Sequence, residues 1–222
     1  MKQKFLSFSL ALVLLLAGCQ LNIQPEGAAF ATALLRSRYY GEVSEDYTRL
    51  VLASPEQAAE DYEDCIAAEM AYLCDYFGAP ATESADADQL RHFVEAAYAR
   101  ISFEVGEQQV SDGAISVPVT VRPLRLFDHI GQEEYVPVVL PLWEKYGLST
   151  DETSLASLSA TQYRNYTREF FSAILTLVEG RLADAPYGEP QTVTLRLEQD
   201  GDYYRPNAED LAAIHGLTLG YE

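Results

Sequence analysis

Positive charge is scarce in this chain of 222 residues. Lysine and arginine together number 15, against 34 aspartate and glutamate residues, so the formal net charge is −19. Acidic residues are densest between positions 42 and 88, where Arg49 is the only basic residue. Proteins that bind phosphate backbones or anionic headgroups carry basic patches instead. The composition therefore excludes nucleic acid as a partner.

Long hydrophobic runs are lacking as well. The run at residues 5–16 follows Lys2 and Lys4 and is shorter than the roughly 20 residues that a membrane-spanning helix needs. A basic start followed by a short apolar core and small residues is typical of a secretion signal. No later stretch is long and apolar enough to span a membrane, so we expect the rest of the chain to be soluble.

The end of this signal, Leu16-Ala17-Gly18-Cys19, resembles the lipobox of bacterial lipoproteins. The resemblance implies that residues 1–18 are removed and that the Cys19 sulfur receives a diacylglyceryl group, with further fatty acyl chains such as palmitate. An ordinary cleaved signal with a chance cysteine is the alternative. We expect a protein on the extracellular face of the bacterial membrane, anchored there by lipid. Residues 19–26 would be a short tether and 27–222 a single domain.

Cysteine is rare, with three in the whole chain. Cys65 and Cys74 remain after Cys19, and a disulfide is the default expectation outside the cell. Both lie in one helical pattern, however, where nine residues correspond to about 13.5 Å of rise. A disulfide requires Cα atoms within about 7 Å. If that helix is unbroken, the two cysteines are free thiols that pack in the core.

Apolar residues recur with the period of a helix and then with that of a strand. Three helices are predicted before residue 101, each with apolar residues at spacings of three and four. Ser54-Pro55 is a typical start for the second helix, and Gly41 is a typical end for the first. Alternating patterns predict two β-hairpins, at about 101–121 and 192–204. Between them a helical block runs from about 130 to 185, with interruptions expected at Pro137, Pro141 and Gly147.

This order predicts an α+β fold with an antiparallel sheet of about four strands. The two hairpins would form the sheet, helices would cover it, and the helical block would be an insertion between the hairpins. Pro118 lacks a donor for the strand ladder, so we expect its strand to lie at an edge or to be locally bulged.

Two segments resemble an uncharacterised group of clostridial-type Gram-positive lipoproteins. They are "VSDGAISVPVTVRPLRLFDHIG" and "YGEPQTVTLRLEQDGDYYRPNAEDLAAI", placed behind the lipobox. That group is similar to domains of unknown function with cystatin-like or nuclear-transport-factor-like folds. The resemblance implies helices packed on a curved sheet, and it implies no particular reaction.

Catalytic signatures are missing. The sequence has no G-x-S-x-G, H-E-x-x-H, C-x-x-C, G-x-G-x-x-G or P-loop pattern, and no cofactor is expected. His129 follows Asp128 at a strand end, where a pocket could form, so His129 with Asp128 or Glu133 is the candidate base of an enzyme. An ordinary loop histidine is the competing interpretation.

The densest acidic cluster is "EDYED" at residues 60–64, where Glu60 and Asp64 are like-charged neighbours on a helix face. Bound Ca²⁺ or a cationic partner would relieve their repulsion, but a solvated acidic face is the expected case, and no metal site is predicted. Tyr203 and Tyr204 form an aromatic doublet in a strand, so one of them must face away from the core. These four residues are the speculative binding residues.

Two functions from different classes remain open. The first is a membrane-tethered, non-enzymatic module of the cell envelope that binds a protein or peptide ligand through its sheet or its acidic helix. The second is an extracellular isomerase or hydrolase with a pocket between helices and sheet. A solute-binding component of a transporter would need two lobes, which this chain is too short to form.

Overall fold

The computed structural model describes residues 26–51, 53–79, 84–111, 114–149, 152–200 and 203–220. The candidate lipobox with Cys19 therefore lies outside the described residues. Helices in this part are α2 (Gly27–Tyr40), α3 (Glu45–Leu50), α4 (Pro55–Tyr76), α5 (Ser84–Tyr98), α6 (Gln132–Tyr146), α7 (Ala160–Arg181) and α8 (Ala208–Gly216), with short 3-10 turns η1 (Glu152–Ser157) and η2 (Leu182–Asp184). Strands are β1 (Ser102–Val105), β2 (Gln109–Ser111), β3 (Ala114–Arg122), β4 (Leu124–Arg125), β5 (Gln191–Asp200), β6 (Tyr203–Pro206) and β7 (Leu219–Gly220).

The main sheet confirms the predicted α+β fold. Its strand order is β1-β3-β5-β6, all antiparallel, and β2 also pairs with β3. The two predicted hairpins are present and are joined to each other through the β3–β5 pairing. The alternation of valines in β3 buries Val117, Val119 and Val121 completely, while the residues between them stay partly accessible.

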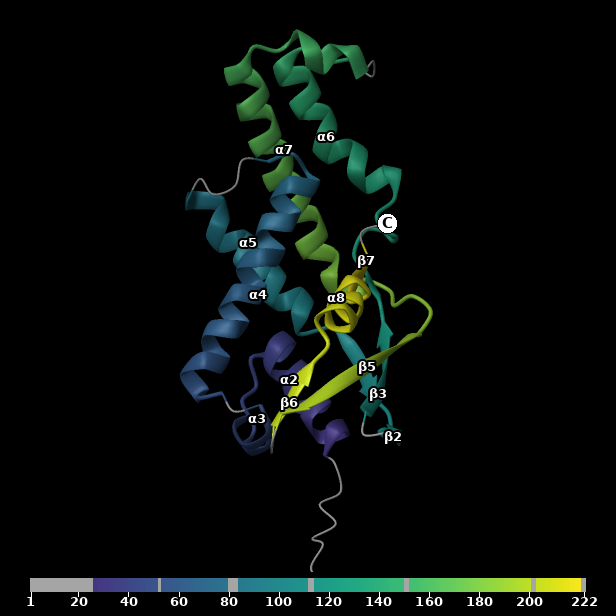
Figure 1. Ribbon diagram of the computed structural model, residues 1–222. Coiled ribbons are helices and arrows are strands. Elements are labelled where there is room, and N and C mark those ends of the chain that lie inside the picture. Colours follow the sequence, from purple (N-terminus) through teal and green to yellow (C-terminus); the bar gives the residue numbers. More distant parts are fainter. Residues whose placement is uncertain are drawn as a thin grey trace, which may run out of the picture.

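One face of the sheet is covered by α2, which packs on β1, β3 and β6. Phe30 of α2 is fully buried, and its ring lies 5.6 Å from that of Tyr204 in β6. Helices α4 and α5 form a further layer over α2 (Figure 1). Threonines on the other face of the sheet remain exposed, and the Thr120 and Thr192 hydroxyl oxygens lie 2.8 Å apart. The sheet is therefore apolar on one side and polar on the other, as the alternation predicted.

Pro118 lies in a central strand, so the edge alternative was wrong. The neighbouring strand is interrupted instead, because β1 ends at Val105 and β2 begins at Gln109. Gly106 fills the gap: its backbone N–H donates to the Pro118 carbonyl at 2.8 Å, and a Cβ there would come within 2.8 Å of the proline ring. The missing donor of Pro118 is thus accommodated by a break in its partner strand.

Helix α6 runs unbroken through both of its prolines, which corrects the expected interruptions at Pro137 and Pro141. A proline cannot donate to the carbonyl four residues earlier, which leaves the carbonyls of Glu133 and Pro137 without their usual donors. Glu133 and both prolines are on the exposed side of α6, where water can satisfy these carbonyls. The helix ends at Gly147, whose φ of 66° gives a left-handed cap.

Cys65 and Cys74 are both buried free thiols on the unbroken helix α4. This confirms the prediction that they do not bridge. The buried side of α4 consists of Ala58, Cys65, Ile66, Glu69, Leu73 and Cys74.

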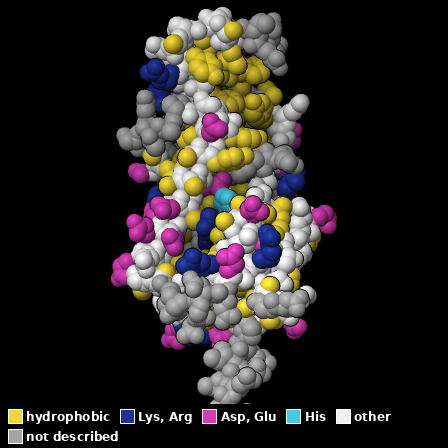
Figure 2. Space-filling model, in the orientation of Figure 1, with side chains coloured by type: hydrophobic (Ala, Val, Ile, Leu, Met, Phe, Trp, Pro, Cys, Tyr) yellow, Lys and Arg dark blue, Asp and Glu magenta, His cyan; other side chains and the backbone are white. Residues whose placement is uncertain are grey.

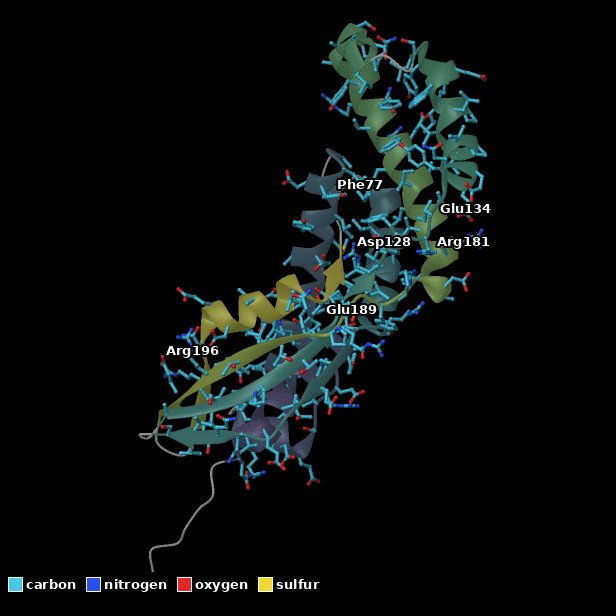
Figure 3. The ribbon with its side chains drawn as sticks, turned by 90° about the vertical axis from the view of Figure 1, so that its right-hand side faces the viewer. Phe77, Asp128, Glu134, Arg181, Glu189 and Arg196 are labelled. Carbon is cyan, nitrogen blue, oxygen red and sulfur yellow. The ribbon has the colours of Figure 1, made fainter. Side chains whose placement is uncertain are left out.

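The predicted helical insertion is a hairpin made of α6 and α7, and it extends beyond the sheet (Figures 1 and 3). Within the hairpin the Trp143 indole N–H donates to the Tyr166 hydroxyl at 3.2 Å, and the Lys145 ammonium binds Glu169 at 2.6 Å. At its base Arg100, which follows α5, donates to the backbone carbonyls of Leu182 and Ala185. These contacts join the end of α7 to the body.

Candidate functional site

The three residues of the predicted catalytic site lie near one another only because they are close in the sequence. His129 is half-buried in the loop between β4 and α6, and its Nε2 lies 3.0 Å from the carbonyl oxygen of Arg181. Because a carbonyl only accepts, Nε2 must carry the proton. Nδ1 is then the possible base, and it is buried with no hydrogen-bond partner among the described residues.

The two carboxylates proposed for this site face other groups. Asp128 binds the Arg125 guanidinium, with Oδ2 2.8 Å from Nε, and Glu133 is exposed in the first turn of α6. No hydrogen bond joins either carboxylate to His129 among the described residues. The catalytic hypothesis stays a prediction, but both ring nitrogens are occupied or shielded, and no carboxylate of the described residues orients the ring.

The predicted tyrosine contact is only partly visible. The Tyr203 side chain is outside the described residues. Tyr204 is 9% exposed, packs on Phe30, and accepts a hydrogen bond from the Glu26 backbone N–H at 3.2 Å. The side chain of Tyr204 therefore has a structural role in the core between α2 and β6.

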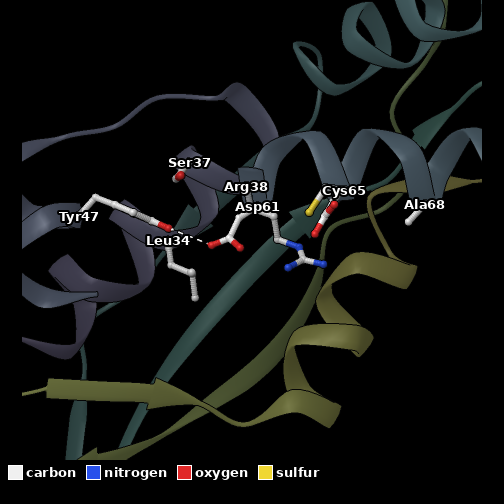
Figure 4. A pocket seen from close by; sticks show the side chains of 8 residues that line it. Leu34, Ser37, Arg38, Tyr47, Asp61, Cys65 and Ala68 are labelled. Atoms are coloured by element: carbon white, nitrogen blue, oxygen red, sulfur yellow. Dashed lines mark hydrogen bonds between the residues drawn. The ribbon is translucent and has the colours of Figure 1, made fainter. Parts of the chain in front are cut away.

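Glu60 and Asp64 are exposed on α4. Asp64 lines a pocket of about 320 Å³ between α2 and α4, together with Arg38, Asp61 and Cys65 (Figure 4). Across the part of the chain that is described, no group of three His, Cys, Asp or Glu side chains lies close enough to hold a metal ion.

A buried polar cluster lies between α4, α5 and α8, and the sequence did not predict it. Glu69 of α4 is 4% exposed and accepts a hydrogen bond from the Tyr98 hydroxyl at 3.1 Å. His215 of α8 brings Nε2 to 3.5 Å from the Glu69 carboxylate, and its ring is parallel to that of Tyr39 at 6.1 Å. The signal was available, since Glu69 falls three residues after Ile66 and four before Leu73 on the apolar side of α4.

Burial controls the titration of this cluster. Desolvation lowers the pKa of His215, and the nearby Arg38 guanidinium lowers it further, while Glu69 acts in the opposite direction. Desolvation raises the pKa values of the Tyr98 hydroxyl and the Cys65 thiol. At neutral pH the cluster therefore holds a neutral imidazole and a protonated thiol. Its residues come from α2, α4, α5 and α8, so the cluster is a structural junction of these four helices.

Because of this junction, we expect the free energy of unfolding to depend on pH. The unfolded His215 binds a proton below about pH 6.5, whereas the folded form resists protonation, so stability is present above that pH and is lost as pH falls through the folded pKa. We expect His215→Gln to reduce the loss of melting temperature between pH 7.5 and pH 5. His92→Gln, on the exposed side of α5, is the matched control and should behave as wild type. An equal effect of both substitutions would contradict the assignment.

Apolar side chains form a second and different concavity. A groove of about 330 Å³ lies between the end of α4, the loop after β4, and the two helices of the hairpin, and its lining is almost entirely hydrophobic. Tyr76 and Phe127 stack across it with ring centroids 6.3 Å apart, and Phe77 packs edge-on to both. Helix α6 contributes Gln132 and Tyr135, and α7 contributes Phe170, Ile174, Leu177 and Val178.

Exposed hydrophobic residues are concentrated in the same part of the molecule, and two of them, Tyr76 and Tyr135, line the groove. Seven of the ten large hydrophobic side chains that are exposed in the described part lie on the hairpin or on the last turns of α4. They are Tyr72, Tyr76, Tyr135, Val136, Leu140, Leu155 and Tyr163. Figure 2 shows hydrophobic side chains gathered over the hairpin, while carboxylates crowd the lower body. Clusters of this kind mark interaction surfaces.

Comparison with known proteins supports the fold and leaves the function open. No family model matches the chain, and no curated protein matches it. A crystal structure with a similar fold belongs to a bacterial candidate lipoprotein. It is the YcdA protein of Bacillus subtilis, which superposes with a TM-score of 0.59 at 14% sequence identity. The match covers 87% of this chain and 56% of YcdA, so this chain spans little more than half of its neighbour's length.

This structural likeness supports only part of the resemblance seen in the sequence. It shows a fold shared with a candidate lipoprotein, and the clostridial and cystatin-like details stay predictions. Within the residues that the structure describes, no helix is both long and apolar enough to cross a bilayer.

Proposed function

We propose that this chain is a lipid-anchored protein of the outer face of a bacterial membrane. Cys19 carries the anchor, and residues 20–26 form a tether. Seven residues reach about 25 Å when fully extended, so the start of α2 stays near the bilayer. The lipobox pattern and the fold shared with a candidate lipoprotein support this part of the proposal.

The domain acts as a binding module for a protein or peptide of the cell envelope, and the hairpin is its binding element. The observation that carries this is the concentration of exposed hydrophobic residues on the hairpin. Helix α2 begins at the end of the molecule opposite the hairpin (Figure 1), so a tether at α2 directs the groove away from the membrane.

An enzyme acting at His129 is the alternative. It is less favoured because Nε2 donates to a backbone carbonyl and Nδ1 is buried. The groove is lined by Phe127 and Ile130, on either side of His129 in sequence, and His129 itself does not line it.

Site-specific crosslinking in cells tests the binding function. A photoreactive amino acid at Tyr135, which is 36% exposed on α6, should give one or a few discrete adducts with envelope proteins. The same group at Val110, which is 52% exposed on β2, is the control and should give few or none. Equal adducts from both positions, or none from Tyr135, would count against a hairpin-centred binding function.

A further inference from the structure

The pocket of about 320 Å³ between α2 and α4 shares no lining residue with the apolar groove and differs from it in chemistry (Figure 4). Ligand pockets range from roughly 300 to 1,000 Å³, so a molecule of the size of an amino acid has room here. Polar or charged side chains line most of it, from Ser37, Arg38, Tyr47, Asp61 and Asp64. One guanidinium and two carboxylates therefore border the same concavity.

Arg38 is the charged group of this pocket whose hydrogen bonds are incomplete. Its Nε is buried and has no hydrogen-bond partner, and its guanidinium forms no ion pair with any carboxylate in the described part of the chain. Arg36, two residues earlier on α2, is paired with Glu42 at 2.6 Å. From inside the fold only the neutral Tyr39 hydroxyl is close enough to act on the Arg38 guanidinium as a hydrogen-bond partner. A ligand carboxylate would supply the missing acceptor through a charge-assisted hydrogen bond.

The two carboxylates of the pocket need donors. Asp61 accepts a hydrogen bond from the Tyr47 hydroxyl at 3.3 Å, and Tyr47 is 1% exposed, so a buried side chain holds one Asp61 oxygen in place (Figure 4). The buried Ser37 hydroxyl is bonded to Tyr47 in turn. Asp64 lies one turn further along α4 and has neither a hydrogen bond nor an ion pair among the described residues. An ionised carboxylate only accepts, and an ammonium group only donates, so ammonium groups suit both positions.

Other ligands match this set of charges less well. A simple anion such as phosphate would satisfy Arg38 but would face two carboxylates. A diamine would satisfy the carboxylates and would leave Arg38 without an acceptor. A divalent cation would be repelled by Arg38, and the described residues contain no group of three metal-ligating side chains.

We propose that this pocket binds a free amino acid that carries a second cationic group on its side chain. The carboxylate of the ligand accepts from Arg38, and its two ammonium groups face Asp61 and Asp64. The one positive and two negative charges of the pocket are then each matched by a charge of opposite sign. The site is separate from the hairpin and adds a small-molecule ligand to the proposed protein-binding function.

Isothermal titration of the full chain in detergent, with lysine as the probe, tests this inference. We expect saturable binding. Cadaverine, which is lysine without its carboxylate, and glutamate, whose side-chain charge is reversed, should each bind at least about tenfold more weakly, because each lacks one charge-assisted contact. Higher salt should weaken lysine binding, since Asp61 and Asp64 are exposed.

Variants with matched controls locate the site. Arg38→Gln should weaken lysine binding at least about tenfold and abolish the preference for lysine over cadaverine, because Arg38 recognises the carboxylate. Asp64→Asn should weaken the binding of lysine and of cadaverine alike. The controls are Arg36→Gln on α2 and Glu60→Gln on α4, which alter exposed residues of the same charge outside the pocket. Both should bind lysine as the unmodified chain does.

Three outcomes would overturn the inference. They are absence of saturable lysine binding, binding of cadaverine or glutamate as tightly as lysine, and losses in the control variants that equal those in the pocket variants. Asp64→Asn keeps the test decisive if Arg38→Gln fails to fold, because Asp64 is exposed and its substitution should leave the melting temperature unchanged. Failure of lysine binding would leave the hairpin-centred function intact, since crosslinking at Tyr135 reports on a different surface.

Discussion

Replacing Cys19 with alanine is expected to move essentially all of the protein out of the membrane fraction, into the medium or into an unprocessed precursor. Each buried methylene of an acyl chain contributes about 0.8 kcal/mol, and two chains give stable anchoring where one chain binds marginally. No described helix can replace that anchor, because none is long and apolar enough to cross a bilayer. Fractionation of cells and labelling with a palmitate analogue measure the effect.

The control for this experiment is Cys65→Ala. Cys65 is buried in α4, where it is inaccessible to the lipid-transferring enzymes, so this variant should remain labelled and in the membrane fraction. Continued labelling of Cys19→Ala would show that the lipobox interpretation is wrong. It would leave the fold and the groove unaffected, since both depend on residues after the tether.

Strands were predictable because alternation reports burial directly. Val117, Val119 and Val121 alternate with partly accessible residues, and the sheet buries all three. The pairing of β3 with β5 was not predictable, because the two strands are separated by the whole hairpin of α6 and α7. Local periodicity contains no information about which strands meet.

The prolines of α6 show where local rules fail. Pro137 and Pro141 predicted breaks, but each lies on the exposed side, where the carbonyls that lose their donors can bind water. The helix continues because Val139, Trp143 and Tyr146 on its other side pack toward α7, and the ring of Tyr146 lies 5.6 Å from that of Tyr166. Tertiary contacts stabilise what the local sequence disfavours.

The candidate site was the least predictable part. Catalytic and metal-binding motifs consist of titratable residues, whereas the groove consists mainly of aromatic and aliphatic side chains from three separate segments. Tyr76, Phe127 and Phe170 each belong to a pattern that also fits a buried core. Only the packing of α4 against the hairpin shows that these patterns leave an accessible concavity.

Phe93→Ala is expected to lower the free energy of unfolding by about 4 kcal/mol, within the usual range of 3–5 kcal/mol for a buried phenylalanine. Phe93 is 1% exposed on α5 and packs with Leu73 of α4 and with Phe171 and Ile174 of α7. Its ring therefore joins the body to the base of the hairpin. A loss of 4 kcal/mol is a large part of the 5–15 kcal/mol typical of a whole domain.

Urea unfolding followed by circular dichroism measures this loss, provided that the slope of free energy against urea is unchanged. The control is Tyr163→Ala, which removes a 47% exposed aromatic ring on α7 of the hairpin. It should change the free energy of unfolding by no more than about 0.5 kcal/mol. If Phe93→Ala cost as little as Tyr163→Ala, the hairpin would not share a core with α4 and α5. The groove, which requires α4 and the hairpin to be fixed relative to each other, would then lose its physical basis.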